Sequence, residues 1–349
     1  MKVDNALTLR QKHTLALLGM SLFLLFSVFF SSCKKDEYIP DVSTVSVDLQ
    51  VVRFDSLLYN IDSADVPAFY QDFTNNHHDF LEGYIHVMVS PGVKVTDTID
   101  FLLAMKNPGL RKLYDTTQML IGDFGKERKE LKQAFKYVKY YFPKKPTPIY
   151  YTYISQFGVG GFTYGESVLG TSLDFHLGEE FPYYDPMIFP NYIKRWMNVE
   201  HIVPDAMRVY ANDLVGEVQG EQFLDYIISN GKVLYLLDHF LPTTPDSIFL
   251  NFTSEQLKWC EDNEFNMWSH FVHEDLLYST KQKDFRKLIN PSPTSSGMPA
   301  ESPGRTGNYM GWQIIKAYMK RHPKTTFEQL MALKDSKKIL QESKFKPKK

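Results

Sequence analysis

Ile149-Tyr150-Tyr151-Thr152-Tyr153-Ile154 is the first of three short runs that decide the fold class. The others are Phe162-Thr163-Tyr164 and Val168-Leu169-Gly170-Thr171-Ser172-Leu173-Asp174-Phe175-His176-Leu177, and the glycine cluster Gly158-Val159-Gly160-Gly161 follows the first run. β-branched and aromatic residues with a period of two, divided by glycines, are typical of paired strands. The runs predict a small antiparallel β meander with a hairpin turn at the glycine cluster. A phosphate-binding loop is not indicated, because neither a Lys-Ser/Thr pair nor a helix start follows the glycines.

Apolar residues at helical spacing flank these runs on both sides. Residues 63–113 form one such region, and a further helix is expected over residues 221–240. Thr253 and Gln256 form a capping box in front of a helix that is expected to continue to Val272. The expected fold class is therefore α+β, mostly helical, with a small antiparallel β meander.

One face of the last long helix carries small residues. Gly304, Gly307 and Gly311 fall on nearly the same face as Ile315 and Tyr318. Since a glycine leaves room for a neighbouring backbone, this face predicts a buried packing seam.

The N-terminus has the pattern of an export signal. Lys2, Arg10 and Lys12 precede a run of 17 uncharged residues, 14–30. The run ends at Phe30-Ser31-Ser32-Cys33, which resembles a relaxed bacterial lipobox, in which the cysteine is acylated and becomes the mature N-terminus. The alternative is an uncleaved signal anchor, because 17 residues lie at the lower limit of a spanning helix. The abrupt change to charged residues after Cys33 favours cleavage and a lipid anchor such as palmitate.

These features divide the chain into four parts. Residues 1–32 are expected to be a lipoprotein signal peptide, and residues 33–44 a tether. Residues 45–333 are expected to form a single globular domain, and residues 334–349 a solvated, lysine-rich tail.

Composition excludes several classes of function. The chain has 349 residues and a net charge of −2, and this balance argues against nucleic acid as a partner. Aromatic residues make up 15% of the chain, which excludes a wholly disordered tether. Cys33 and Cys260 are its two cysteines, so acylation of Cys33 leaves no intramolecular disulfide. The helical position of Cys260 predicts burial rather than a catalytic role.

A first candidate site lies at the end of the third run. Asp174 and His176, with Glu179 close behind, supply carboxylates and an imidazole for an acid/base pair or a cation site. Strand alternation would place Asp174 and His176 on one face. The alternative is structural, since polar groups are expected where a strand ends.

A second candidate is a metal site on the capped helix. His270 and His273 stand at i and i+3, close enough to share an ion. The glutamate that follows them is in the wrong place for the helical zinc motifs. A charged helix end that faces solvent is the alternative, and no metal or other cofactor is expected.

Seven stretches together resemble the GldB-type gliding-motility lipoprotein family of Bacteroidota. They are Arg53-Phe54-Asp55-Ser56-Leu57-Leu58, Leu173-Asp174-Phe175-His176-Leu177-Gly178, Ile202-Val203-Pro204-Asp205, Gly231-Lys232-Val233-Leu234-Tyr235, Tyr278-Ser279-Thr280, Ile289-Asn290-Pro291 and Ser302-Pro303-Gly304-Arg305. The resemblance implies a cell-envelope lipoprotein of the outer membrane that associates with gliding and secretion components. Lys34-Lys35-Asp36-Glu37 is similar to lipoprotein-export signals of that phylum, and the periplasmic and surface faces both stay open.

A more distant resemblance concerns zinc peptidases whose helix carries His-Glu-x-x-His. Alignment of the helices places Pro204, Asp205 and Arg208 on that motif and Asn230 on the position of the third ligand. Pro204 offers no donor, Arg208 is a fixed cation and Asn230 is a weak neutral ligand, so the metal ligands are absent. The resemblance implies a zincin-like core with a degenerate site. Its groove would run along the free edge of a strand over residues 173–177, beside Asp174, His176 and Arg305.

The leading hypothesis is a non-enzymatic, lipid-anchored envelope protein that binds motility or other envelope proteins through this groove. The rival hypothesis is an active hydrolase or metallopeptidase that uses Asp174, His176 and Glu179, or a metal at His270 and His273. A solute-binding lipoprotein is a third, weaker hypothesis, because the chain shows no two-lobed duplication.

Overall fold

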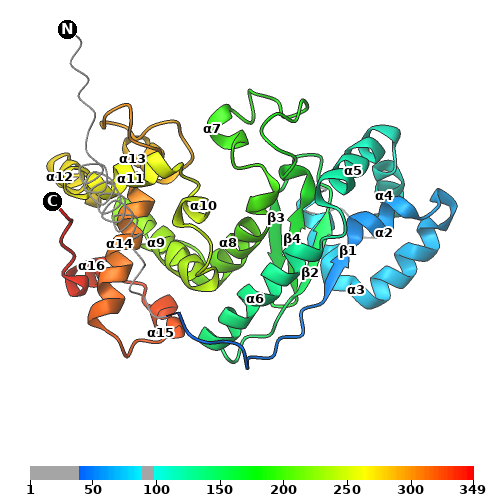
Figure 1. Cartoon of the computed structure of the whole chain (residues 1–349), viewed down its shortest axis with the longest axis horizontal. Helices are drawn as coiled ribbons and strands as arrows, with labels where there is room; N and C mark the ends of the chain where they lie inside the picture. Colours follow the sequence, from blue (N-terminus) through cyan, green and yellow to red (C-terminus); the bar gives the residue numbers. More distant parts are fainter. Residues whose placement is uncertain (1–38, 89–97) are drawn as a thin grey trace, which may run out of the picture. The chain divides into compact units, whose positions relative to one another are not determined.

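The computed structural model describes residues 39–88 and 98–349 (Figure 1). The chain divides into two units, and every element named below lies in the second, the compact unit of residues 41–349. The predicted signal peptide and Cys33 fall outside the described residues. Within the described ranges, no helix combines the length and the apolar character needed to cross a bilayer.

The elements that precede and form the sheet come first along the chain. They are β1 (Val51–Arg53), α2 (Phe54–Asn60), α3 (Val66–Met88), α4 (Thr98–Met105), α5 (Pro108–Ile121), α6 (Gly125–Tyr141), β2 (Ile149–Tyr153), β3 (Gly161–Tyr164), β4 (Val168–Ser172) and the 3₁₀ turn η3 (Leu173–Phe175).

The remainder of the unit is helical. Its elements are α7 (Asn191–Lys194), α8 (Ile202–Val215), α9 (Phe223–Phe240), α10 (Asp246–Leu250), α11 (Ser254–Asp262), α12 (Glu264–His273), α13 (Gln282–Ile289), α14 (Thr306–Arg321), α15 (Phe327–Ala332) and α16 (Ser336–Ser343). The prediction of a mostly helical α+β chain is confirmed.

The strands form one mixed sheet in the order β1-β2-β4-β3. β2 is parallel to both β1 and β4, whereas β3 and β4 form an antiparallel hairpin. The predicted antiparallel meander is therefore wrong, because β4 inserts between β2 and β3. Gly158 and Gly160 lie in the crossover from β2 to β3 rather than in a hairpin turn, and Gly165, with φ +54°, lies in the β3–β4 turn. Apolar residues that alternate with a period of two show which face of a strand is buried. They do not show whether the neighbouring strand is parallel or antiparallel.

Both faces of the sheet are covered, which accounts for its aromatic residues. Tyr151 and Tyr153 belong to a core shared with α2 and α3, where the rings of Tyr151 and Phe80 stack with centroids 4.1 Å apart. Tyr150, on the other face, belongs to the larger core that α6, α8 and α9 help to form. Figure 1 shows α3 on one side of the strands and α6 and α8 on the other.

The expected strand over residues 173–177 is a 3₁₀ turn followed by loop. The carboxylate of Asp174 accepts hydrogen bonds from the backbone N–H groups of Ser155 (3.1 Å) and Phe157 (2.7 Å), and also from the Ser172 hydroxyl. These bonds tie the end of β4 to the loop after β2 and turn the chain away from the sheet. The predicted free edge for strand addition is thus wrong at this place, and β4 itself is paired on both sides.

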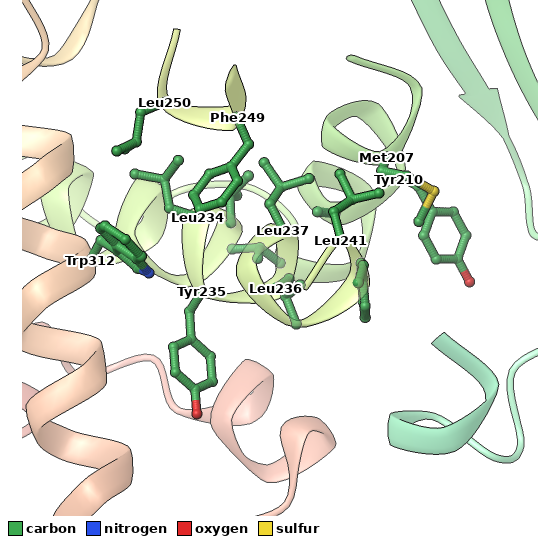
Figure 2. Packing of buried hydrophobic residues seen from close by; sticks show 14 of the residues in the cluster. Met207, Tyr210, Leu234, Tyr235, Leu236, Leu237, Leu241, Phe249, Leu250 and Trp312 are labelled. Carbon is green, nitrogen blue, oxygen red and sulfur yellow. The ribbon is translucent and has the colours of Figure 1, made fainter. Parts of the chain in front are cut away.

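Helix α9 lies at the centre of the helical part. Every residue from Gly231 to Asp238 is buried, and Figure 2 shows Leu234, Tyr235 and Leu237 pointing in different directions from the helix. Tyr235 contacts Phe327 of α15, with ring centroids 5.5 Å apart. A helical segment that is buried on all sides is typical of a core position.

The predicted glycine seam is present between α9 and α14. A Cβ on Gly311 would overlap the backbone carbonyl of Ile227, and a Cβ on Gly231 would overlap the backbone of Gly311. The absence of both Cβ atoms is what lets the two backbones pack directly against each other.

The capping box of Thr253 and Gln256 is confirmed, and Cys260 is fully buried. Burial raises the pKa of the Cys260 thiol, which suits a packing role. The single long helix expected here is instead two helices, α11 and α12, because Asn263 leaves the helical region with φ −121° and ψ 18°.

The C-terminal segment is folded rather than solvated. Helix α16 packs on α14 and α9 with Ile339 buried. The rings of Phe345 and Trp268 pack with their centroids 5.5 Å apart. The backbone N–H of Lys348 donates a hydrogen bond to Oε2 of Glu264, with 3.0 Å between nitrogen and oxygen. Ile339, Leu340 and Phe345 pack against the core, although lysines dominate the composition of this segment.

Candidate functional site

A cavity of about 400 Å³ lies among the helices of the second unit. Helices α8, α9 and α14 and the segments that follow α10 and α13 line it. Its principal polar residues are Asp205, Arg208, Asn230, Asn251, Arg305 and Asn308. The volume is in the range of sites for small molecules and short peptide segments.

Asp205 and Arg208 enter the cavity wall from successive turns of α8. Their spacing of three places both on one face of the helix. The Asp205 side chain is 36% exposed because it faces the cavity, and its Oδ2 lies 3.4 Å from Nε2 of His176. Burial alone would raise the pKa of Asp205, but the hydrogen bond and charge of His176, with the nearby Arg208, lower it below its ordinary value.

His176 is almost fully buried behind Asp205. Its Nδ1 lies 3.1 Å from the carbonyl oxygen of Ser172. A carbonyl oxygen only accepts, so Nδ1 carries a proton and Nε2 is the atom that faces the carboxylate. The 3.4 Å between Nε2 of His176 and Oδ2 of Asp205 is within the range of an ion pair.

The Arg208 guanidinium is held at one end only. Its Nη2 donates to the backbone carbonyl of Phe249, whereas its Nε is buried without a hydrogen-bond partner. Burial lowers the pKa of Arg208, and the Asp205 carboxylate acts in the opposite direction. A buried N–H without an acceptor is costly unless a ligand or water supplies one.

Arg305 approaches the cavity from the residue before α14. Its backbone has φ +64°, in the left-handed region that residues other than glycine seldom adopt. Among the described residues, its guanidinium has no hydrogen bond and no ion pair. Burial and the neighbouring Arg208 lower the pKa of Arg305 to about 10, with Asp205 opposing them. Arg305 also lines a smaller pocket of about 30 Å³ together with Tyr192 and Trp196.

Asparagines supply most of the remaining polar surface. Asn230 Nδ2 donates to Asn308 Oδ1 at 2.8 Å, and Asn308 Nδ2 donates to the carbonyl of Ile289 at 2.9 Å. Asn251 ends α10 with φ +54°, and its Oδ1 is buried without a hydrogen-bond partner. Sequence reasoning found Asn230 but missed Asn251 and Asn308, since a lone asparagine in a helix or cap carries no motif.

The first candidate set does not assemble. Asp174 is fully buried, its carboxylate binds the backbone amides named above, and burial raises its pKa. Glu179 is exposed, and the structure gives it no hydrogen bond or ion pair with Asp174 or His176. The expectation that strand alternation brings Asp174 and His176 to one face is wrong, because this segment is not a strand. His176 instead joins Asp205.

The second candidate pair lies at the surface end of α12. His273 is 85% exposed and its Nδ1 is 3.1 Å from Glu274. His270 packs against the backbone of Gly297. Across residues 39–88 and 98–349, no three His, Cys, Asp or Glu side chains converge in a way that could hold a metal ion.

Three of the four residues that were aligned with the zinc-peptidase motif line the cavity. Asp205, Arg208 and Asn230 line it together with Arg305, while Pro204 is buried in the first turn of α8. The lining contains no Ser, Thr, Cys or His side chain. Guanidinium, carboxylate and amide groups in this arrangement recognise charge and hydrogen-bonding groups.

The comparisons give one family match. The sequence model described as "Gliding motility protein GldB" matches residues 35–347, which is almost the whole chain. No curated protein and no solved structure matches it, and a zincin-like core is not shown. The match runs through the sheet, the cavity and α16 alike. The chain therefore belongs to the gliding motility protein GldB family.

Proposed function

We propose that this protein is a non-enzymatic, lipid-anchored component of the cell envelope that serves the gliding-motility and secretion machinery by binding other envelope proteins. Family membership implies a gliding-motility lipoprotein role and is the observation that carries the proposal. The cavity around Asp205, Arg208 and Arg305 supports a binding role, because its lining supplies recognition groups rather than a nucleophile.

The N-terminal sequence supports the anchor. The apolar run before Cys33 and the charged residues after it fit acylation of the cysteine, and the proposed final location of the lipid anchor is the outer membrane. More than one acyl chain makes such attachment durable. The folded unit would then stay at the membrane through its lipid.

A hydrolase is the competing function. It would use His176, Asp174 and Glu179, or a metal at His270 and His273. The geometry favours binding, because Asp174 is occupied by backbone amides and His176 by Asp205. A catalytic pair needs a base within reach of the proton that it takes up.

Complementation of a strain that lacks the gene tests the proposal. Wild type, Cys33→Ser, Glu179→Gln and His273→Gln would be compared for gliding or secretion, with in-cell crosslinking to recover bound envelope proteins. The proposal expects loss of function only for Cys33→Ser. A loss for Glu179→Gln or His273→Gln with normal amounts of protein, or stoichiometric zinc in the purified full-length protein, would support the hydrolase instead.

A further inference from the structure

The cavity contains more positive than negative charge. Two guanidiniums, those of Arg208 and Arg305, line it with one carboxylate, that of Asp205. His176 already engages this carboxylate from behind. Charges removed from water are stable only when they are paired and hydrogen-bonded, so the lining favours an anionic ligand.

The unsatisfied atoms point to the same conclusion. Arg208 Nε is buried without an acceptor, and the Arg305 guanidinium has no hydrogen bond or ion pair within the described residues. Guanidiniums bind carboxylates and phosphates through paired N–H groups. A group with two acceptor oxygens between Arg208 and Arg305 would satisfy both.

We propose that the cavity binds the C-terminal end of a peptide segment of a partner protein, with its free carboxylate on Arg208 and Arg305. This assignment adds a class of ligand to the proposed function. It rests on that function for the premise that the cavity binds a partner. Capture of a terminal carboxylate is a recurring way in which domains recognise peptides.

The rest of the lining fits a peptide better than a small inorganic anion. An asparagine side chain offers a donor and an acceptor like those of the peptide bond, and Asn230, Asn251 and Asn308 place such groups around the cavity. Asn251 Oδ1 is buried and unpartnered, so it is an acceptor for a peptide N–H. Leu234 and Phe252 give an apolar wall for the terminal side chain.

The strained backbone of Arg305 supports a fixed binding geometry. Its left-handed conformation at the start of α14 is held by a hydrogen bond from its N–H to the carbonyl of Lys287, at 3.1 Å. Strained backbone of this kind persists where the surroundings determine it and clusters at binding sites. The smaller pocket that Arg305 shares with Tyr192 and Trp196 gives the upstream part of a peptide a place next to the cavity.

Thermal unfolding of the full-length protein in detergent tests the inference. The probes are a pool of N-acetylated random tripeptides with free carboxylates, the same pool as C-terminal amides, and inorganic phosphate. The free-acid pool is expected to raise the unfolding midpoint, because it binds only the folded state, and the amide pool is not. Phosphate is expected to have less than one tenth of the apparent affinity of the free-acid pool.

Variants locate the binding. Arg305→Gln removes one guanidinium, and Asn212→Asp places a negative charge at an exposed position of the same lining. Each is expected to weaken binding of the free-acid pool at least 10-fold. Arg286→Gln on the exposed side of α13 is the matched control and is expected to leave binding unchanged.

Equal shifts with the acid and amide pools, or none with either, would overturn the inference. An equal shift with phosphate would do the same and would identify a site for small oxyanions. Crosslinking in cells measures partner binding separately from peptide binding. If the free-acid peptides give no shift but the crosslinks to envelope proteins persist, only the proposed carboxylate site is overturned. If the wild-type protein forms no crosslinks to envelope proteins in cells, the proposed function is overturned.

Discussion

His176 Nε2 and Asp205 Oδ2, 3.4 Å apart, connect the segment after β4 to the first turn of α8. The imidazole is buried, and the carboxylate faces the cavity on its other side. The pair thus holds the sheet and the cavity wall in one arrangement. A change of charge at Asp205 is therefore expected to affect both the packing against the sheet and the cavity wall.

Asp205→Asn is expected to lower the free energy of unfolding by about 1–2 kcal/mol. The amide cannot form the ion pair and leaves His176 buried opposite a neutral group. Urea unfolding of the variant and of Asp213→Asn checks this prediction. Asp213 lies on the same helix but is exposed, so its substitution is expected to change stability by less than about 0.5 kcal/mol.

The same pair predicts an acid dependence. The pKa of Asp205 is lowered in the folded state, so its stabilisation is present above its ordinary pKa of 3.8 and is lost as the pH falls through the lowered value. The difference in unfolding free energy between wild type and Asp205→Asn should shrink as the pH falls below about 4. A difference that is constant over this range would contradict the ion pair.

Gly311→Ala is expected to destabilise the protein by about 3 kcal/mol or to prevent folding. The new methyl group would overlap the backbone carbonyl of Ile227 and force α9 and α14 apart. Gly109→Ala is the control, because its Cβ would meet only Asn107 Oδ1, at 3.2 Å, near the start of α5. Chemical denaturation of both variants measures the effect, and equal midpoints would refute the glycine seam.

Lys232 predicts a rise of stability with pH. It is buried on α9 and donates to the carbonyl of Leu333, and burial, with the nearby Lys334, lowers its pKa to about 8 from 10.5. Between these values the unfolded chain binds more protons than the folded one. The free energy of unfolding should therefore increase from pH 8 to pH 10.5, by up to about 3 kcal/mol.

Lys232→Met should remove this rise, whereas Lys283→Met, at an exposed position of α13, should retain it. Denaturation curves at four pH values between 7.5 and 10.5 make the comparison. A rise of equal size in both variants would assign the pH dependence to other groups.

Cys33→Ser is expected to release the protein from membranes without unfolding it. Acylation requires the thiol, and the folded unit of residues 41–349 contains the cores and the cavity. Phase partition in a cloud-point detergent and incorporation of labelled palmitate report the anchor, and the unfolding temperature should match that of the wild type. Membrane retention of the variant would favour the uncleaved signal anchor.

Features encoded by neighbouring residues could be predicted from the sequence. The capping box of Thr253 with Gln256 and the glycines of α14 depend on spacing within one helix, and both are present. The same holds for Asp205 and Arg208, whose spacing places them on one face of α8. Their common position on the cavity follows from that spacing.

Features that depend on distant partners were missed. The insertion of β4 between β2 and β3 is decided by a crossover, and the turn at Asp174 by amides of the loop near residue 156. Likewise, Asn251 and Asn308 become neighbours of the cavity only because α10 and α14 pack around α9. A single sequence records none of these pairings.

The packing of α16 also bears on the order in which the helical core can assemble. Helix α16 packs on α14 and α9, and the Lys348 backbone binds Glu264. Helices α9 and α14 precede α16 in the chain, so during synthesis they can pack against each other before α16 is available. Helix α16 is therefore the last of these three helices to join the core during synthesis.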